Sequence, residues 1–448
     1  MNTYYIKETK SIIRKTGNKI FLLRNDFDYS KVKLLEITNL GKEIIEYLST
    51  VKTENDIKQK FANSGINEQD VIKYVNFLSK KGYVKKWNFN KKGIRFSGQK
   101  FKNEWLMEKF PFAATIELSS HCNFSCVHCY LAKHREVQQE LSLPQIKTIL
   151  DKLHDIGILH LFLSGGEPML RKDFVDIYIY AKKLGFLVGV FTNGSILTNE
   201  QLNAFREYPP LEIDISLYGA DDETYKKVVG RDGAFDKVVN NIKTLIANGI
   251  FVSAKSPILT ITKNSIKDMI KLTKDLHVPF RMSFDINPSI DNDDLSQYQV
   301  SSAEAAYLYK KYEKPFYKAS VDTQKKFEKH QVHLERRRYA CKSGERGCFV
   351  DYRGIVSPCI FTRHRGVNIF SNTTEKIWEQ VRCVTYEKLA ENDDYKCLHC
   401  KKANICNSCP AVRELSYGNP LIVKNEDCLY ANELYKIMKE GGDLDERS

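Results

Sequence analysis

Three cysteines within one short segment are spaced like the ligands of a metal cluster. Cys122 and Cys126 have three residues between them, and Cys126 and Cys129 have two. Four-iron clusters that only carry electrons normally use four thiolates, so three thiolates leave one iron open to a substrate. The alternative is a structural zinc site whose fourth ligand is His121 or His128.

The ends of the next strand-like runs carry residues suited to binding a small polar molecule. Paired glycines let the backbone approach a ligand and leave carbonyls free to accept hydrogen bonds from an ammonium group. Small polar residues at such ends are also common turn formers. The residues at these ends are Gly165, Gly166, Glu167, Pro168, Asn193 and Ser216.

A second set of eight cysteines lies near the C-terminus. Two C-x2-C pairs and the overall clustering indicate metal ligation by iron–sulfur clusters or by zinc ribbons. The set consists of Cys341, Cys348, Cys359, Cys397, Cys400, Cys406, Cys409 and Cys428. Cys383 stands outside every pattern, and we expect it to be a buried free thiol.

The overall composition indicates a globular protein of several domains. The chain has 448 residues, of which 42% are hydrophobic, and no apolar run is long enough to cross a membrane. The first residues lack a signal-peptide core, so we expect a cytoplasmic protein without a membrane partner. The net charge of +13 suits solubility first and an acidic peptide second, and without a long basic run it does not predict nucleic-acid binding.

The first 90 residues predict a small α+β domain. Two strand-like runs, Asn18 to Leu23 and Lys31 to Ile37, precede three amphipathic helical patterns and a closing strand at Tyr83 to Lys86. Small strands followed by three short helices form a winged-helix-like unit. We expect residues 91–111 to be a linker.

Strand-like and helical runs alternate from Ala113 to about Leu276, which predicts a parallel sheet. We expect a partial (β/α)6 TIM-like barrel over residues 112–285, with its working loops at the carboxyl ends of the strands. A helical bridging segment over 286–340 and a cysteine-rich iron–sulfur domain over 341–448 complete the predicted organisation.

The cysteine loop resembles that of the radical S-adenosylmethionine (SAM) enzymes. The resemblance implies a 4Fe-4S cluster on Cys122, Cys126 and Cys129, whose open iron binds SAM and whose electron produces a 5'-deoxyadenosyl radical. It further implies SAM contacts from the strand-end residues given above. Many relatives carry Arg-Gly or Thr-Gly where this chain has Val229-Gly230. Either Lys255 or Arg231 therefore binds the SAM carboxylate, or this chain does not need the pairing.

The C-terminal cysteines resemble the SPASM extension, which holds two auxiliary 4Fe-4S clusters. That resemblance implies three clusters in all. It assigns the first auxiliary cluster to Cys341, Cys348, Cys359 and Cys409. It assigns the second auxiliary cluster to Cys397, Cys400, Cys406 and Cys428.

The N-terminal unit resembles the precursor-recognition domains of enzymes that modify ribosomally made peptides. In those domains a leader peptide adds a strand to the small sheet and packs on the third helix. If a leader docks on this chain in the same way, the docking surface consists of Lys31 to Ile37 and Asp70 to Lys80. Winged helices more often bind DNA, but Glu68 and Asp70 would place negative charge where a base-reading helix presents donors.

Together these parts resemble the maturases of sactipeptides, in which a cysteine sulfur is joined to carbon by a thioether. Sulfatase-maturing relatives carry an aspartate that acts as a base at the position of Ile360. Isoleucine cannot act as a base, so the sequence does not favour sulfatase maturation. The expected partners are a precursor peptide and an electron donor such as flavodoxin or ferredoxin. Carbon–carbon crosslinking, and a DNA-binding iron–sulfur redox sensor, remain as alternatives.

Overall fold

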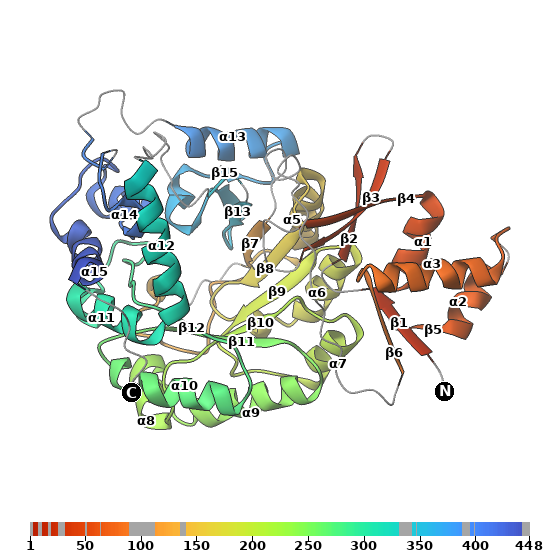
Figure 1. The fold of residues 1–448 in the computed structure, drawn as a ribbon, viewed down its shortest axis with the longest axis horizontal. Helices are drawn as coiled ribbons and strands as arrows, with labels where there is room; N and C mark the ends of the chain where they lie inside the picture. Colours follow the sequence, from red (N-terminus) through yellow and green to blue (C-terminus); the bar gives the residue numbers. More distant parts are fainter. Residues whose placement is uncertain are drawn as a thin grey trace.

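A computed structural model describes most of the chain, in three parts that follow one another across the molecule (Figure 1). The described residues are 3–7, 11–16, 19–25, 32–49, 52–62, 64–88, 113–134, 140–330, 343–345, 347–387, 395–397 and 399–440. The barrel is central, and the N-terminal and C-terminal parts lie at opposite ends of the view.

The N-terminal part contains two small antiparallel sheets and three helices. One sheet has the order β5-β1-β6 and the other β2-β3-β4. The strands are β1 (Thr3–Lys7), β2 (Ser11–Thr16), β3 (Lys19–Asn25), β4 (Val32–Ile37), β5 (Lys52–Thr53) and β6 (Val84–Asn88), and the helices are α1 (Asn39–Tyr47), α2 (Glu54–Phe61) and α3 (Glu68–Lys80). The predicted helices and the strands at β3, β4 and β6 are confirmed, whereas β1 and β2 were not predicted.

Local sequence explains where these helices start and which face they bury. Thr53 begins α2 in a capping box with Asp56, so two backbone donors that the helix leaves free find acceptors. Ile44, Ile57 and Val75, one from each helix, are fully buried in a shared apolar core. The N-terminal part therefore has a core of its own.

The barrel is built from six parallel strands, and helices cover its outer side (Figure 1). The strands are β7 (Ala113–Glu117), β8 (His160–Ser164), β9 (Leu187–Thr192), β10 (Ile213–Ser216), β11 (Val252–Pro257) and β12 (Phe280–Ser283). The helices are α5 (Leu143–Ile156), α6 (Phe174–Lys183), α7 (Asn199–Glu207), α8 (Asp222–Val229), α9 (Ala234–Ala247) and α10 (Ile266–Asp275). The predicted partial barrel is confirmed.

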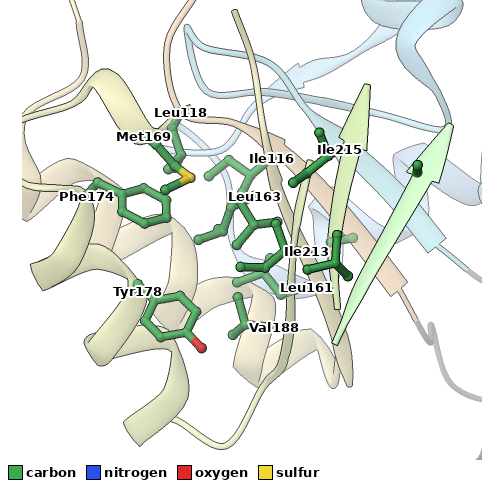
Figure 2. Close-up of a cluster of buried hydrophobic side chains, with 14 of the residues drawn as sticks. Ile116, Leu118, Leu161, Leu163, Met169, Phe174, Tyr178, Val188, Ile213 and Ile215 are labelled. Atoms are coloured by element: carbon green, nitrogen blue, oxygen red, sulfur yellow. The ribbon is translucent and has the colours of Figure 1, made fainter. Parts of the chain in front are cut away.

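Alternate strand residues form the barrel core. Figure 2 shows Leu161 and Leu163 of β8 and Ile213 and Ile215 of β10 among the apolar side chains that meet Phe174 and Tyr178 of α6. Since strand side chains alternate between faces, the residues between them point to the opposite, concave face. That face is where the chemistry-bearing side chains of the strands lie.

The C-terminal part continues the barrel sheet. Within the described residues, β13 pairs in parallel with β7, and β14 and β15 follow in antiparallel order. The strands of this part are β13 (Gly347–Val350), β14 (Ile355–Ser357) and β15 (Val367–Asn368). The helices after the barrel are α11 (Ser302–Tyr312), α12 (Lys314–His330), α13 (Thr374–Tyr386), α14 (Pro410–Tyr417) and α15 (Leu429–Glu440). The sheet thus crosses the predicted boundary at residue 341, although the domain division itself stays a prediction.

No helix within the described ranges combines the length and the apolar character needed to cross a membrane.

Candidate functional site

The glycine loop holds the start of the cysteine loop by direct backbone contact. The Gly166 amide donates to the Ser119 carbonyl at 2.8 Å, and the Glu167 amide donates to the His121 carbonyl at 2.8 Å. A Cβ on Gly165 would lie 2.2 Å from the Ser119 oxygen, and a Cβ on Gly166 would lie 2.3 Å from the His121 oxygen. Only residues without a side chain allow this approach.

The other side of the cysteine loop is fixed by the end of α8. The Ser125 and Val127 amides donate to the carbonyls of Val229 and Val228 at 2.8 and 3.0 Å. At the position where the resemblance leads us to expect Arg or Thr, Val229 thus contributes its backbone carbonyl. A prediction from side-chain type could not reveal that role.

The three cysteines of the loop are partly buried. The Cys122 thiol accepts hydrogen bonds from the Phe124 amide at 3.4 Å and from the Asn193 side chain at 3.8 Å. Burial raises the pKa of Cys122, and nearby Glu167 and Cys129 raise it further. Burial therefore favours the protonated thiol at Cys122, and a bound cation would stabilise its thiolate.

The donor set of this loop consists of three thiols, the ligand type that iron–sulfur clusters use. A zinc ion needs its ligands to converge on one point, whereas a four-iron cluster places each thiolate on a different iron. Partly buried thiols on a loop fixed from both sides meet the second requirement.

Glu167 links the glycine loop to the end of β9. Its buried carboxylate accepts hydrogen bonds from the Asn193 amide at 2.7 Å, the Thr192 hydroxyl at 2.8 Å and the Met169 amide at 3.0 Å. Burial raises the pKa of Glu167 to about 7 against the lowering effect of these bonds. This network sets the position of Asn193, whose side chain reaches Cys122.

Ser216 and Lys255 are neighbours across β10 and β11. The Lys255 ammonium lies 3.2 Å from an Asp214 carboxylate oxygen and 3.9 Å above the centre of the Phe191 ring. Arg231, the other cation considered for a carboxylate, donates to the Asn123 carbonyl at 3.0 Å. Both cations thus engage acceptors of the chain itself.

Four of the C-terminal cysteines lie together. Burial raises the pKa of Cys406, and the neighbouring thiols of Cys428, Cys397 and Cys400 raise it further. The other three thiols are therefore near enough to Cys406 to affect its pKa. This is the same group of four that the SPASM resemblance assigns to one cluster.

The other C-terminal cysteines belong to the segments around β13 and α14. Burial in β13 raises the pKa of Cys348 to about 12, while Cys359 and Cys409 pack against the same small apolar cluster beside α13. Cys341 lies outside the described residues. Cys383 is exposed on α13, so the expectation of a buried thiol was wrong: it falls on the outer face of that helix.

A cavity of about 630 Å³ lies between the barrel and the C-terminal cysteines. From the barrel it is lined by Tyr130, Ser164 and Phe191, and from the C-terminal part by Cys348 and Cys359. Residues from both cysteine-bearing parts therefore face one space. A substrate group held there would be enclosed by walls from two parts of the chain.

Sequence reasoning missed a buried group beside this cavity. Glu117 at the end of β7 accepts a hydrogen bond from the Tyr130 hydroxyl at 2.8 Å and lies 3.2 Å from Arg363. The position of Tyr130 directly after Cys129 was a usable signal. No spacing in the sequence indicated Arg363, which is 246 residues from Glu117.

Replacing Gly166 by alanine should destabilise the site far more than the same change at an open glycine. The new methyl group meets fixed backbone, so we expect a loss of about 2–3 kcal/mol in unfolding free energy. Gly249→Ala is the matched control, because its surroundings are open and only its positive φ of 75° is strained, at a cost of about 1 kcal/mol. Urea unfolding measures both variants, and equal losses would contradict the backbone clash.

Comparison with known proteins agrees with this geometry. Residues 116–276 match the model of the radical SAM superfamily. The chain is 27% identical over 347 residues to an AdoMet-dependent heme synthase of Methanosarcina barkeri, covering 72% of this chain and 98% of the relative. It is also 27% identical over 370 residues to the antilisterial bacteriocin subtilosin biosynthesis protein AlbA of Bacillus subtilis, covering 80% of each chain.

A solved structure shares the overall fold. The crystal structure of Streptococcus suis SuiB bound to its precursor peptide SuiA superposes with a TM-score of 0.60 at 15% identity, covering 95% of this chain and 99% of that one. The match includes the N-terminal part, the barrel and the cysteine-rich C-terminal part. Residues 116–276 are therefore similar to the radical SAM superfamily, and over most of its length the chain is similar to a heme synthase, to a bacteriocin biosynthesis protein and, in fold, to SuiB.

Proposed function

We propose that this enzyme modifies a ribosomally made precursor peptide and joins a cysteine sulfur of the peptide to carbon through a thioether. The observation that carries the proposal is the shared cavity, which is lined by Tyr130, the residue after Cys129, and by the C-terminal cysteines Cys348 and Cys359. Support comes from one relative, which is named a bacteriocin biosynthesis protein.

In this proposal Cys122, Cys126 and Cys129 hold a 4Fe-4S cluster with one open iron. SAM lies against the glycine loop Gly165 to Pro168, where backbone carbonyls accept from its ammonium group. Asn193, Ser216 and Lys255 are its further contacts. Cluster and SAM together supply a carbon radical able to remove hydrogen from an unactivated carbon.

The C-terminal cysteines hold two auxiliary clusters in the sets described above. Thioether formation removes one hydrogen from carbon, which the radical takes, and one from the thiol, which leaves as a proton together with one electron. A cluster held by Cys348 and Cys359 would lie beside the cavity that these residues line and would supply an acceptor for that electron. Flavodoxin or ferredoxin is the proposed external electron carrier.

The chain itself contributes enclosure and orientation. Phe191 and Ile360 present apolar surface to the cavity, so water is disfavoured where a radical has to survive. Ser164 adds a hydroxyl group that can orient a peptide backbone. These residues direct the reaction, and the cofactors break the bonds.

The precursor docks on the N-terminal part. In the described residues β4 is an edge strand, which offers free backbone groups to an added strand. Beside it, Tyr74 of α3 reaches the junction of β4 and α1, near Gly41. Its ring stacks on Phe77, which is 40% exposed. An exposed Phe77 ring, stacked on the partly buried Tyr74 beside a free strand edge, suits an apolar anchor residue of a peptide.

Charge favours an acidic leader. Residues 1–112 contain 23 Lys and Arg against 12 Asp and Glu, a net charge of +11 out of +13 for the chain. Lys81 lies 5.8 Å from the Phe77 ring, and exposed Lys80 is beside it. An acidic peptide would therefore be attracted to the same end of α3 that carries the aromatic pair.

Cys126→Ala should abolish SAM cleavage. The anaerobically reconstituted protein is given SAM and a strong reductant, and 5'-deoxyadenosine is measured by mass spectrometry. Wild type and the control Cys383→Ala, which changes an exposed cysteine, should produce it equally, because Cys383 lies outside both cysteine sets. Equal production by Cys126→Ala would show that this loop does not hold the catalytic cluster. When a candidate precursor peptide is added to the same reaction, a product lighter than that peptide by two hydrogen atoms identifies crosslinking.

Phe77→Ala should weaken binding of a labelled leader peptide about tenfold, or about 1.4 kcal/mol, because an aromatic anchor is lost. Fluorescence anisotropy measures the affinity. Phe251→Ala is the control, since that ring is 48% exposed on the barrel. Unchanged peptide binding by Phe77→Ala, or tighter and salt-sensitive binding of duplex DNA by the wild type, would contradict peptide docking here.

A further inference from the structure

Glu117, Arg363 and Tyr130 form a buried unit whose members come from three separate segments. The Arg363 guanidinium donates to both Glu117 carboxylate oxygens, at 3.2 and 3.4 Å. The Tyr130 hydroxyl donates to one of the same oxygens at 2.8 Å. The side chains of Arg363 and Glu117 are only 8% and 0% exposed, so the carboxylate depends on these partners and not on water.

The unit joins the two cysteine-bearing parts of the chain. Tyr130 follows Cys129 directly, and Arg363 follows Cys359 by four residues. The guanidinium lies 6.0 Å from the Tyr130 ring and 5.3 Å from the Phe349 ring, and both rings line the cavity. Its remaining Nε–H donates to the Ile360 carbonyl at 3.0 Å, which ties Arg363 to the turn after Cys359.

Stability alone does not account for a buried ion pair of this kind. The cost of removing both charges from water generally offsets their attraction, and apolar replacements are often as stable. Burial raises the pKa of Glu117, and Arg363 opposes that shift. The nearby carboxylate of Asp351 is already paired with Arg353 at 2.6 Å. The local charge is therefore balanced only while Glu117 and Arg363 are both present.

We propose that Glu117 is a positioning residue that sets the reduction potential of the centre at Cys348 and Cys359 by neutralising Arg363. The potential of an iron–sulfur centre depends on the net charge around it. An unpaired guanidinium beside the cavity would favour the reduced, more negative centre and raise its potential. An unpaired carboxylate would have the opposite effect. This inference rests on the proposed function, which places an auxiliary cluster at those cysteines.

A double-mutant cycle tests the proposal on the reconstituted full-length protein. Redox titration monitored by electron paramagnetic resonance measures the potential of the auxiliary centre at several pH values, because burial raises the pKa of Glu117 and the charge effect of a lone carboxylate appears only where it is ionised. Glu117→Gln should raise the potential and Arg363→Gln should lower it. The double variant Glu117→Gln/Arg363→Gln should return it to the wild-type value, because the two charge changes cancel.

Two further variants separate charge from structure. Glu117→Asp keeps the negative charge and should retain the wild-type potential. Glu304→Gln breaks the partly exposed pair with Lys263, whose atoms lie 2.9 Å apart, and should change nothing. Iron content and melting temperature accompany each titration. If Glu117 and Arg363 were merely structural, iron content and melting temperature would fall in both single variants and in the double variant. The reduction potential would then not shift in opposite directions in the two single variants.

The outcomes are distinguishable from failure of the proposed function. Wild-type protein that shows no iron–sulfur signal from the C-terminal cysteines would overturn the proposed function and this inference with it. A normal signal whose potential is the same in both single variants would overturn only the inference. If Glu117→Gln does not load iron, the lower potential of Arg363→Gln decides the question, and its absence overturns the proposal.

Discussion

The close approach of two backbone segments is the constraint on which the site depends. Gly165 and Gly166 run against residues 119–121 so closely that no side chain fits between them. Two hydrogen bonds of 2.8 Å lock this contact. This contact fixes the first cysteine of the loop relative to β8. The buried Glu167 carboxylate, which follows the two glycines, accepts a hydrogen bond from the Asn193 amide and so fixes Asn193 as well. A loop with three ligands needs such a frame, because loops do not hold their own geometry.

Continuity of the sheet supplies the second constraint. Because β13 pairs with β7, the segment that carries Cys348 is a strand of the barrel sheet. The two cysteine-bearing parts therefore share a rigid wall, and the cavity forms along it. Glu117 lies at the end of β7, where this wall meets the cysteine loop. Its pairing with Arg363 closes the contact from the other side.

Much of this arrangement could be predicted because short-range patterns specify it. The βα alternation placed the barrel strands, and the glycine and cysteine spacings placed the loops at their ends. The apolar stripes and caps located the N-terminal helices. The missing features depend on long-range pairing, for which one sequence has no local signal. These are the pairing of β13 with β7, the meeting of Glu117 with Arg363, and the face of α13 that bears Cys383.

The iron content of cysteine-set variants tests the central claim most directly. Three four-iron clusters predict about twelve irons per reconstituted chain, as measured by iron and sulfide analysis with Mössbauer spectroscopy. Replacing Cys122, Cys126 and Cys129 together by alanine should remove about four irons, as should replacing Cys397 and Cys400, whereas Cys383→Ala should remove none. Bound zinc in place of iron, or loss of all iron from any one set of changes, would contradict three separate cluster sites.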